Sequence, residues 1–452
     1  MTNGDRLAEA RLTRRTLLAR AAAAGGVLGL TGLGRAAPAQ ASGWAPTRAY
    51  AGEAAFRWFD LALELVRATP GFSPPVASRA FGYAGVALYE AVAPGMPKRR
   101  SLAGQLNGFG AVPGAADASY HWPTVANSAL ASMLRSLFPT APAEKAAAID
   151  ELEHLLGESG RAVPPPGIYR RSVARGAAVA DHVFEWSRSD GGDEAFLRNF
   201  PPYAPSSGPG SWVPTPPGFL PALQPYWGAN RPFSLPRGDA ADPGPPLAYS
   251  EDRDSTFYLE ARECYLAATH LTSDQEAVAR FWSDDPGQTA TPPGHSLSIL
   301  TQVARSLDID LGRAAEAYAK VGIAVADAFI ACWSTKYRYN LLRPVTYIRS
   351  LVDGAWTPLL VTPPFPEYTS GHSVQSAAAA EALTALFGDV AFVDRTHERR
   401  GLPARSFRSF REAAEEAAVS RLYGGIHFRS AIERGLEQGR AIGRRAAALT
   451  TG

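Results

Sequence analysis

Three short stretches in the last quarter of the chain carry side chains suited to binding a tetrahedral oxyanion. Together they supply three positively charged groups, a hydroxyl, a glycine and two imidazoles. Cations and hydrogen-bond donors neutralise the oxygens of such an anion, and an imidazole can serve as a ligand or as an acid and base. The stretches contain Lys336, Arg343 and Pro344, then Thr369, Ser370, Gly371 and His372, and finally Ser420, Arg421 and His427. This combination predicts a pocket for phosphate or for the similar anion vanadate.

The first stretch places two of the cations seven residues apart in the sequence. Seven residues make about two turns of an α-helix, so Lys336 and Arg343 are expected on the same helix face and within reach of one anion. Pro344 disfavours helical conformation in the residue before it. The spacing therefore predicts that this helix stops just before Pro344.

The second stretch lies at the predicted start of a helix. Residues 370–372 follow a proline-rich segment at 363–366 and precede the alanine-rich run 377–387, which Gly388 ends. The N-terminus of a helix carries free backbone N–H groups and the positive end of the helix dipole. We therefore expect this helix to direct its N-terminus at the anion.

The third stretch lies between two predicted helices. Arg421 is expected at the end of a helix that Ser409 and Glu412 begin with a capping box. Glycines 424–425 break this helix, and His427 is expected to open the next one. The break brings an arginine and an imidazole to the same place.

The order Lys-x6-Arg-Pro, Ser-Gly-His and Ser-Arg-x5-His resembles the three-part signature of the phosphatidic acid phosphatase type 2 superfamily. That superfamily includes the vanadium-dependent haloperoxidases and the bacterial acid phosphatases. The surrounding sequence is similar to the bacterial vanadium haloperoxidase-like branch at residues 281–295, 333–349, 365–372 and 423–439, and more weakly at 77–92 and 212–233. The resemblance thus covers most of the chain.

Two positions depart from the pattern of the superfamily. Proline is usual where Thr369 stands, a change that a loop can absorb. An aspartate often lies four residues after the second histidine, and this chain has Ala431 there. Any carboxylate that supports His427 must therefore come from elsewhere in the chain.

The resemblance implies a role for each residue of the pocket. His427 would bind vanadium through a ring nitrogen, and His372 would be the acid–base group across the anion. Lys336, Arg343 and Arg421 would neutralise the vanadate oxygens, with hydrogen bonds from Ser370 and the Gly371 amide. Trp333 and Phe365 match positions that flank the pocket, and Phe365 matches the phenylalanine of chloride-oxidising members. Asp285, or alternatively Asp284, is the expected ion-pair partner of Arg421.

The implied reaction is the oxidation of halide by hydrogen peroxide to hypohalous acid, with an organic molecule as a further acceptor. Vanadate acts in it as a Lewis acid that makes peroxide oxygen electrophilic, and Lys336 polarises the peroxide further. Phosphate fits the same site, so the alternative function is an exported acid phosphatase in which His427 attacks phosphorus and His372 protonates the leaving oxygen. A third possibility is an oxyanion-binding protein without turnover, which only Ala431 favours.

The remaining histidines carry less information. His295 follows Pro-Pro-Gly near the two aspartates, and one interpretation places it along the channel that leads to the pocket. The other five lie outside any such group of residues, so surface or hydrogen-bonded core positions are expected for them. These are His121, His154, His182, His270 and His397.

The N-terminal residues have the features of an export signal. Arg14 and Arg15 precede an alanine-, glycine- and leucine-rich stretch, and Ala39-Gln40-Ala41 fits a cleavage site. Residues 1–41 are therefore interpreted as a twin-arginine signal peptide, which predicts a periplasmic or extracellular protein. They hold six arginines against two acids, so a chain with formal net charge +2 becomes about −2 after cleavage. This charge indicates neither a nucleic acid nor an anionic membrane as partner, and no membrane span is expected in the mature chain.

Periodicity of apolar residues predicts an all-α protein with long proline-rich loops. Residues 42–452 are expected to form a single catalytic domain of two packed helix bundles, about 44–250 and about 251–450, of which the second carries the pocket. Segment 200–246 is rich in proline, but its aromatic residues predict an ordered loop rather than a linker. Cys264 and Cys332 are compatible with a disulfide or with two buried thiols. The predicted helices span 50–69, 75–92, 122–138, 143–159, 168–187, 255–266, 273–282, 296–306, 311–342, 373–387, 406–422 and 428–449.

Overall fold

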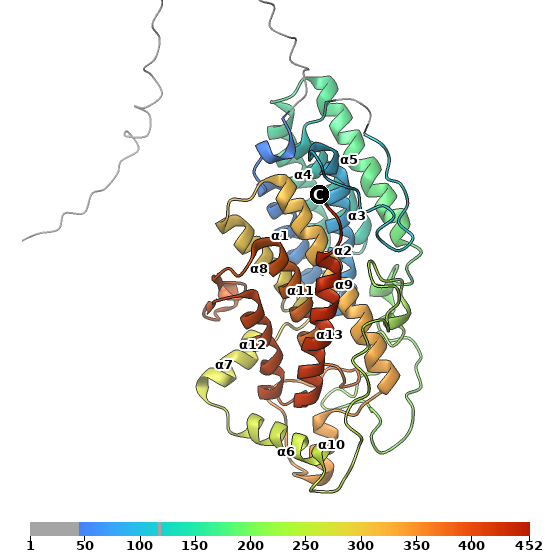
Figure 1. Cartoon of the computed structure of the whole chain (residues 1–452), viewed down its shortest axis with the longest axis vertical. Helices are drawn as coiled ribbons and strands as arrows, with labels where there is room; N and C mark the ends of the chain where they lie inside the picture. Colours follow the sequence, from blue (N-terminus) through green and yellow to red (C-terminus); the bar gives the residue numbers. More distant parts are fainter. Residues whose placement is uncertain (1–44, 116–118) are drawn as a thin grey trace, which may run out of the picture. The chain divides into compact units, whose positions relative to one another are not determined.

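The computed structural model describes residues 45–115 and 119–452. Most of its regular structure is helical, as the periodicity of apolar residues predicts (Figure 1). Within these residues there are thirteen α-helices and one pair of three-residue strands, so the all-α prediction is confirmed. The predicted signal peptide at residues 1–41 lies outside the described residues.

The helices follow one another in this order: α1 Glu53–Ala68, α2 Pro74–Val92, α3 Trp122–Leu137, α4 Ala143–Arg161, α5 Pro166–Ser187, α6 Thr256–Thr269, α7 Ser273–Phe281, α8 Thr291–Ser306, α9 Leu311–Tyr339, α10 Pro344–Leu351, α11 Gly371–Phe387, α12 Phe410–Tyr423 and α13 Arg429–Ala447. The antiparallel strands are β1 Phe392–Asp394 and β2 Arg405–Phe407.

Helix α9 is the central element of the fold. Almost all of its side chains are buried, because it packs against α2 on one side and against α11 and α13 on another (Figure 1). Lys336 is the last buried residue of this helix, so the packing delivers a cation to its C-terminal end. Helix α9 contacts helices of both predicted bundles, and the division of the domain near residue 250 stays a prediction.

Helices α11 and α13 approach each other through three glycines at four-residue spacing, Gly435, Gly439 and Gly443. A Cβ on Gly439 would lie 2.1 Å from the carbonyl oxygen of Val374, and one on Gly443 would lie 2.4 Å from that of Ala378. The two backbones can be this close only because one helix has no side chains on the shared face. This contact holds the N-terminus of α11 against α13.

The proline-rich segment 200–246 is ordered, as its aromatic residues predict. Trp212, Trp227 and Phe233 are buried, whereas Phe219 is exposed. The buried carboxylate of Asp327 on α9 accepts hydrogen bonds of 2.6–3.1 Å from the backbone N–H groups of residues 233–235 and from the Ser234 hydroxyl. The segment is thus attached to the central helix.

Several predicted helix boundaries were wrong. Helix α9 ends at Tyr339 because Asn340 adopts a left-handed conformation with φ of 46°, and Pro344 begins the unpredicted helix α10 instead of only stopping α9. Residues 405–407 pair as a strand, so α12 begins later than predicted. Helix α8 begins at Thr291, since two prolines fit its first turn.

Both cysteines are free and buried, which agrees with the interpretation as two thiols. Cys264 lies in a small hydrophobic cluster around α6 and α10, and Cys332 lies in the main core. None of the helices within 45–115 and 119–452 is long and apolar enough to cross a membrane.

Candidate active site

Lys336 and Arg343 reach the same place from different elements, which corrects the prediction of one shared helix face. Lys336 lies in the last turn of α9, and Arg343 is the N-cap residue of α10. The Lys336 Nζ donates hydrogen bonds of 2.8 and 3.0 Å to the carbonyl oxygens of Pro366 and Glu367. Burial lowers the pKa of Lys336 to about 7 and that of Arg343 to about 10.

The aromatic pair Trp333 and Phe365 forms a wall beside these cations. The two ring centroids are 4.9 Å apart. The Phe365 ring centroid lies 4.8 Å from the Arg343 guanidinium carbon and 5.1 Å from the Lys336 Nζ. Both cations therefore face an aromatic ring where water is excluded.

Ser370, Gly371 and His372 form the start of α11, as the sequence predicts. The Ser370 hydroxyl caps the helix by accepting a hydrogen bond from the Ser373 N–H at 3.4 Å. Gly371 and His372 line the cavity, and the Nε2 atom of His372 is buried without a hydrogen-bond partner. Burial, together with the charge of Arg421, holds the pKa of His372 well below its usual value. This imidazole is therefore a neutral group that can accept a proton.

The departure at Thr369 also has a structural explanation. Its buried hydroxyl donates a hydrogen bond of 2.7 Å to the Gln438 side chain on α13. The Gln438 amide in turn donates to the Thr335 hydroxyl on α9 at 2.9 Å. Threonine therefore links α9, α13 and the loop before α11 through hydrogen bonds that a proline could not make.

Arg421 is buried in the last turn of α12, where its Nε donates to the Ser420 hydroxyl and one terminal nitrogen donates to the Ala279 carbonyl. The predicted ion pair with Asp285 or Asp284 was wrong. Neither carboxylate lies within 4.0 Å of the guanidinium, because exposed Asp285 bonds to Ser283 and buried Asp284 pairs with histidines. Burial lowers the pKa of Arg421 to about 10, partly offset by the charges of these aspartates.

His427 precedes α13 and is supported by a carboxylate that sequence reasoning missed. Its Nδ1 lies 2.8 Å from the Oε1 atom of buried Glu367, which also accepts the Phe428 N–H at 2.9 Å. Its Nε2 lies 3.2 Å from a terminal nitrogen of Arg343. Burial and the charge of Arg343 hold the pKa of His427 well below its usual value. The Nδ1–H therefore points at Glu367, and the Nε2 lone pair faces the cations.

Glu367 replaces the carboxylate that Ala431 cannot provide. Burial raises its pKa to about 7, against the opposing charges of Lys336 and Arg343. Its Oε2 atom has no hydrogen-bond partner. The motif Pro-Phe-Pro-Glu placed this residue five positions before His372, but only the fold shows that it meets His427.

These contacts leave an excess of positive charge in the centre of the domain. Lys336, Arg343 and Arg421 are at most 3% exposed. Within the described ranges none of them forms an ion pair, and the Nη2 atom of Arg343 is buried without any partner. Uncompensated buried cations are costly unless an anion joins them. A bound oxyanion would supply negative charge that balances these cations.

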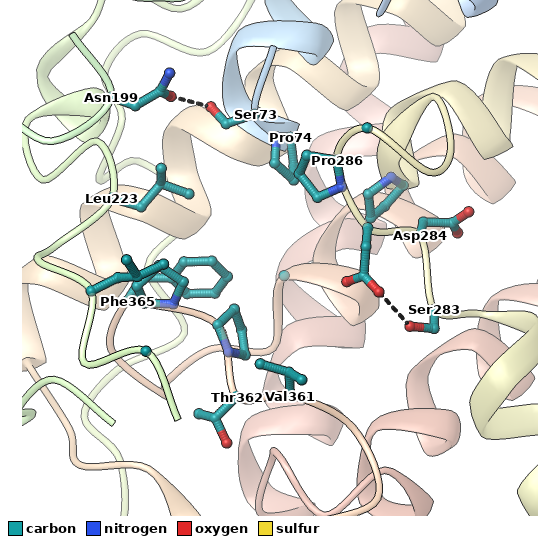
Figure 2. A pocket seen from close by; sticks show the side chains of 18 of the residues that line it. Ser73, Pro74, Asn199, Leu223, Ser283, Asp284, Pro286, Val361, Thr362 and Phe365 are labelled. Carbon is teal, nitrogen blue, oxygen red and sulfur yellow. Dashed lines mark hydrogen bonds between the residues drawn. The ribbon is translucent and has the colours of Figure 1, made fainter. Parts of the chain in front are cut away.

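A cavity of about 850 Å³ leads to His372, Arg421 and His427. Figure 2 shows it ringed by four separate segments, with Leu223 and Phe365 across from Asp284 and Pro286, and with Pro74 and Val361 on the remaining sides. Asp285 lines this cavity, as predicted. Most of the wall is apolar, whereas His372, Arg421 and His427 supply polar groups.

Two histidines outside the motif lie in a buried cluster that the sequence did not predict. His295 does not line the cavity but lies buried between Asp284 and Asp394, at 2.8 and 2.7 Å. His397 lies in the core, which is one of the two positions expected for it, and its Nε2 lies 3.1 Å from Asp284. The sequence feature that could have indicated this cluster is the pair of aspartates at 284–285, which were interpreted from the sequence as partners of Arg421.

Comparison with known proteins gives one sequence match and several structural matches. Residues 316–451 match the family model of the VCPO second helical-bundle domain. A structure described as the first bacterial vanadium-dependent iodoperoxidase is 40% identical, with a TM-score of 0.81, and the match covers 88% of this chain and 96% of that chain. No curated protein matches the chain.

Two structures of a bacterial vanadium-dependent chloroperoxidase share the fold at lower identity. The holo form is 17% identical with a TM-score of 0.63, over 85% of this chain and 93% of that chain. The apo form is 16% identical with a TM-score of 0.63, over 86% and 97% of the two chains.

Proposed function

Because this chain belongs to the vanadium-dependent haloperoxidase family, we propose that it oxidises halide with hydrogen peroxide at a vanadate bound to His427. The observation that carries this proposal is the group of three buried cations around His427, which form no ion pair within the described residues. Arg343 lies 3.2 Å from the Nε2 atom of His427, and the charges of all three cations lower the pKa of this imidazole. A trianionic or dianionic oxyanion balances these charges, and an imidazole lone pair is a suitable ligand for its central atom.

The chemistry of the residues present suits vanadate. Arg343 Nη2 and His372 Nε2 are buried polar atoms that lack a partner and need one. The first amides of α11 have no acceptor within the helix, so they can donate to an anion. Lys336 still has a proton to donate after its two bonds to carbonyl oxygens.

Each residue then has a defined task. Bound vanadate supplies Lewis acidity that activates hydrogen peroxide toward halide. Glu367 accepts the Nδ1–H of His427, which fixes the tautomer and keeps the Nε2 lone pair available as ligand. His372 accepts a proton at Nε2 when hydrogen peroxide arrives, because its imidazole is neutral. Lys336, Arg343 and Arg421 stabilise negative charge that develops on oxygen.

For the halide, we propose iodide. The support is the relative described as an iodoperoxidase, at 40% identity over 88% of this chain. Phe365, which resembles the residue of chloride-oxidising members, does not by itself decide the halide, since its ring also shields Lys336 and Arg343.

For the organic acceptor, we propose an apolar molecule that enters through the mouth of the cavity. Four apolar side chains that line this cavity are exposed, namely Phe200 at 45%, Phe219 at 62%, Leu220 at 49% and Val361 at 71%. An exposed apolar patch beside a polar pocket is typical of a binding site.

For the location, we propose export through the twin-arginine pathway, supported by the pattern at residues 14–41. Fusion of residues 1–41 to a reporter that is active only after this kind of export tests the proposal. Replacement of Arg14 and Arg15 by lysine should block export of the reporter.

The function is tested with the mature chain stripped of metal and oxyanion and then supplied with orthovanadate, hydrogen peroxide and one halide at a time. We expect vanadate-dependent halogenation of an indicator dye, fastest with iodide. A phosphatase assay runs in parallel. Phosphoester cleavage that vanadate inhibits, together with no halide oxidation, would overturn the proposal in favour of a phosphatase.

A further inference from the structure

A second buried polar cluster lies beside the oxyanion pocket and is not used by the proposed reaction. It contains Asp284 from the α7–α8 loop, His295 from α8, Asp394 from β1 and His397 from the loop that follows. All four residues are at most 5% exposed. One nitrogen from each histidine and one oxygen from Asp284 lie within 4.8 Å of one another.

Two atoms in this cluster are buried but lack a hydrogen bond. They are the Oδ1 of Asp284 and the Nε2 of His397, which face each other at 3.1 Å without hydrogen-bond geometry. Buried polar atoms that make no hydrogen bond are rare in proteins, and each needs an explanation such as a bound ion. Figure 2 shows the Asp284 carboxylate pointing away from the cavity, so it is not held there for the oxyanion.

The surroundings of His295 have the pattern of a metal ligand. Its Nδ1 lies 2.8 Å from Asp284, and its Nε2 lies 2.7 Å from Asp394. Asp394 is itself oriented by the Thr396 N–H at 2.9 Å. A carboxylate on the far nitrogen of an imidazole is the usual partner of a metal-bound histidine.

We propose that Asp284, His295 and His397 bind one divalent transition-metal ion, with Asp394 as the hydrogen-bond partner of His295. Two imidazoles and a carboxylate suit Zn²⁺ and its neighbours in the first transition row. A dication also balances the two buried carboxylates while both histidines stay neutral. Bonds of about 2.0–2.1 Å require donor atoms about 3.4 Å apart, so small side-chain rotations complete the site.

The ion acts as a structural clamp. It joins the loop at 283–286, which forms one wall of the oxyanion cavity, to the segment at 394–397. Trp282 stacks on His295 with centroids 4.5 Å apart, and Phe281 forms T-shaped contacts with both imidazoles. These rings exclude water, which strengthens binding of the ion.

The test measures metal directly, on the full mature chain and without vanadate, so that its outcome is independent of halide oxidation. Elemental analysis of the purified chain is followed by chelation and titration with Zn²⁺ or Co²⁺. We expect about one equivalent bound per chain, visible Co²⁺ absorption bands, and a higher melting temperature with the ion. His397→Ala should abolish the absorption bands, and Asp394→Asn should weaken binding about 10–100-fold.

His154→Ala, at an exposed histidine on α4, is the matched control and should bind metal like the unmodified chain. His397→Gln, which keeps a polar side chain, serves if His397→Ala does not fold. A wild-type chain that binds neither Zn²⁺ nor Co²⁺ and shows no change in melting temperature would overturn the proposal. Equal Co²⁺ spectra for the wild type and a folded His397 variant would overturn it as well.

Discussion

The two buried polar regions of this domain have opposite charge balance. The oxyanion pocket holds Lys336, Arg343 and Arg421 with no carboxylate in ion-pair distance. The neighbouring cluster holds Asp284 and Asp394 around two histidines. Both regions place an imidazole against a carboxylate, at 2.8 Å for His427 and Glu367 and at 2.8 Å for His295 and Asp284.

This difference shows that the neighbouring charges determine which ion a buried histidine can bind. The Nε2 atom of His427 lies beside Arg343, and the pKa of this histidine is lowered. Its imidazole is therefore neutral and can donate a lone pair to the central atom of a bound anion. Burial opposes charge on His295 too, but the charges of Asp284 and Asp394 outweigh it and raise its pKa to about 10, so the proposed metal ion must displace a proton from this imidazole. The same side chain therefore serves opposite ions, depending on the charges at its second nitrogen.

The largest expected effect comes from removing the imidazole on the cationic side. His427→Ala should abolish vanadate binding and halide oxidation, because it removes the nitrogen atom proposed as the ligand of vanadium. Isothermal titration with vanadate and the dye assay measure both. His154→Ala is the control. Halide oxidation that persists in His427→Ala would show that His427 is not the vanadium ligand, and the comparison between the two buried histidines would then fail.

His372→Ala should lower turnover by about 10²–10⁴-fold, which is the usual contribution of a positioned acid–base group. Vanadate binding should persist, since the three cations and His427 remain. Turnover at saturating vanadate and the vanadate dissociation constant separate the two effects. An equal loss in both quantities would indicate that His372 holds the anion and does not transfer a proton.

Glu367→Gln should weaken vanadate binding about 10-fold at neutral pH, as is typical for the loss of a ligand's hydrogen-bond partner. In the unmodified chain, binding should be strongest near pH 7. It falls above about pH 7 as Lys336 loses its proton, and below about pH 7 as Glu367 gains one.

The variant should lose the acidic limb of this pH profile and keep the alkaline limb. Glu433→Gln, at an exposed position on α13, should leave both limbs in place. An acidic limb that persists in Glu367→Gln would show that another group titrates there.

The smallest effect on chemistry is expected from the glycine contact between α11 and α13. Gly439→Ala places a Cβ 2.1 Å from the Val374 carbonyl oxygen, which should lower the free energy of unfolding by about 1–3 kcal/mol. Vanadate affinity should change less than for Glu367→Gln. Urea denaturation checks the stability, and Gly167→Ala, which meets no atom within 4 Å, should not destabilise the chain. Unchanged stability in Gly439→Ala would mean that α13 shifts freely.

The sequence was sufficient for most helices and for the residues that gather at the pocket. Their spacing follows local rules, so the helix start at residues 370–372 and the turn at 424–425 could be predicted. The backbone conformation between Lys336 and Arg343 could not be predicted. Asn340 adopts a left-handed conformation that ends α9 early, and Arg343 lies at the same site from the start of α10.

Partners far apart in the chain were beyond sequence reasoning. Glu367 and His427 are separated by 60 positions, and His295 and Asp394 by 99. The charges of Asp284 and Asp285 raise the pKa of Arg421, but neither carboxylate forms a hydrogen bond with it. Asp284 contacts two histidines instead. Only packing decides which of several possible partners a buried carboxylate meets.

The attachment of the proline-rich segment to Asp327 has a mechanical consequence. Residues 233–235 are held by the buried carboxylate, and Leu223 is held through its N–H by Pro364 and through its carbonyl by Trp333 and Tyr337. The stretch with Phe219 and Leu220 reaches the cavity mouth between two anchored points, Leu223 on one side and Trp212 on the other, whose N–H donates to the Asn340 carbonyl at 2.7 Å. Substitutions between these two points can adapt the entrance to acceptors of different size, while the anchored residues stay in place.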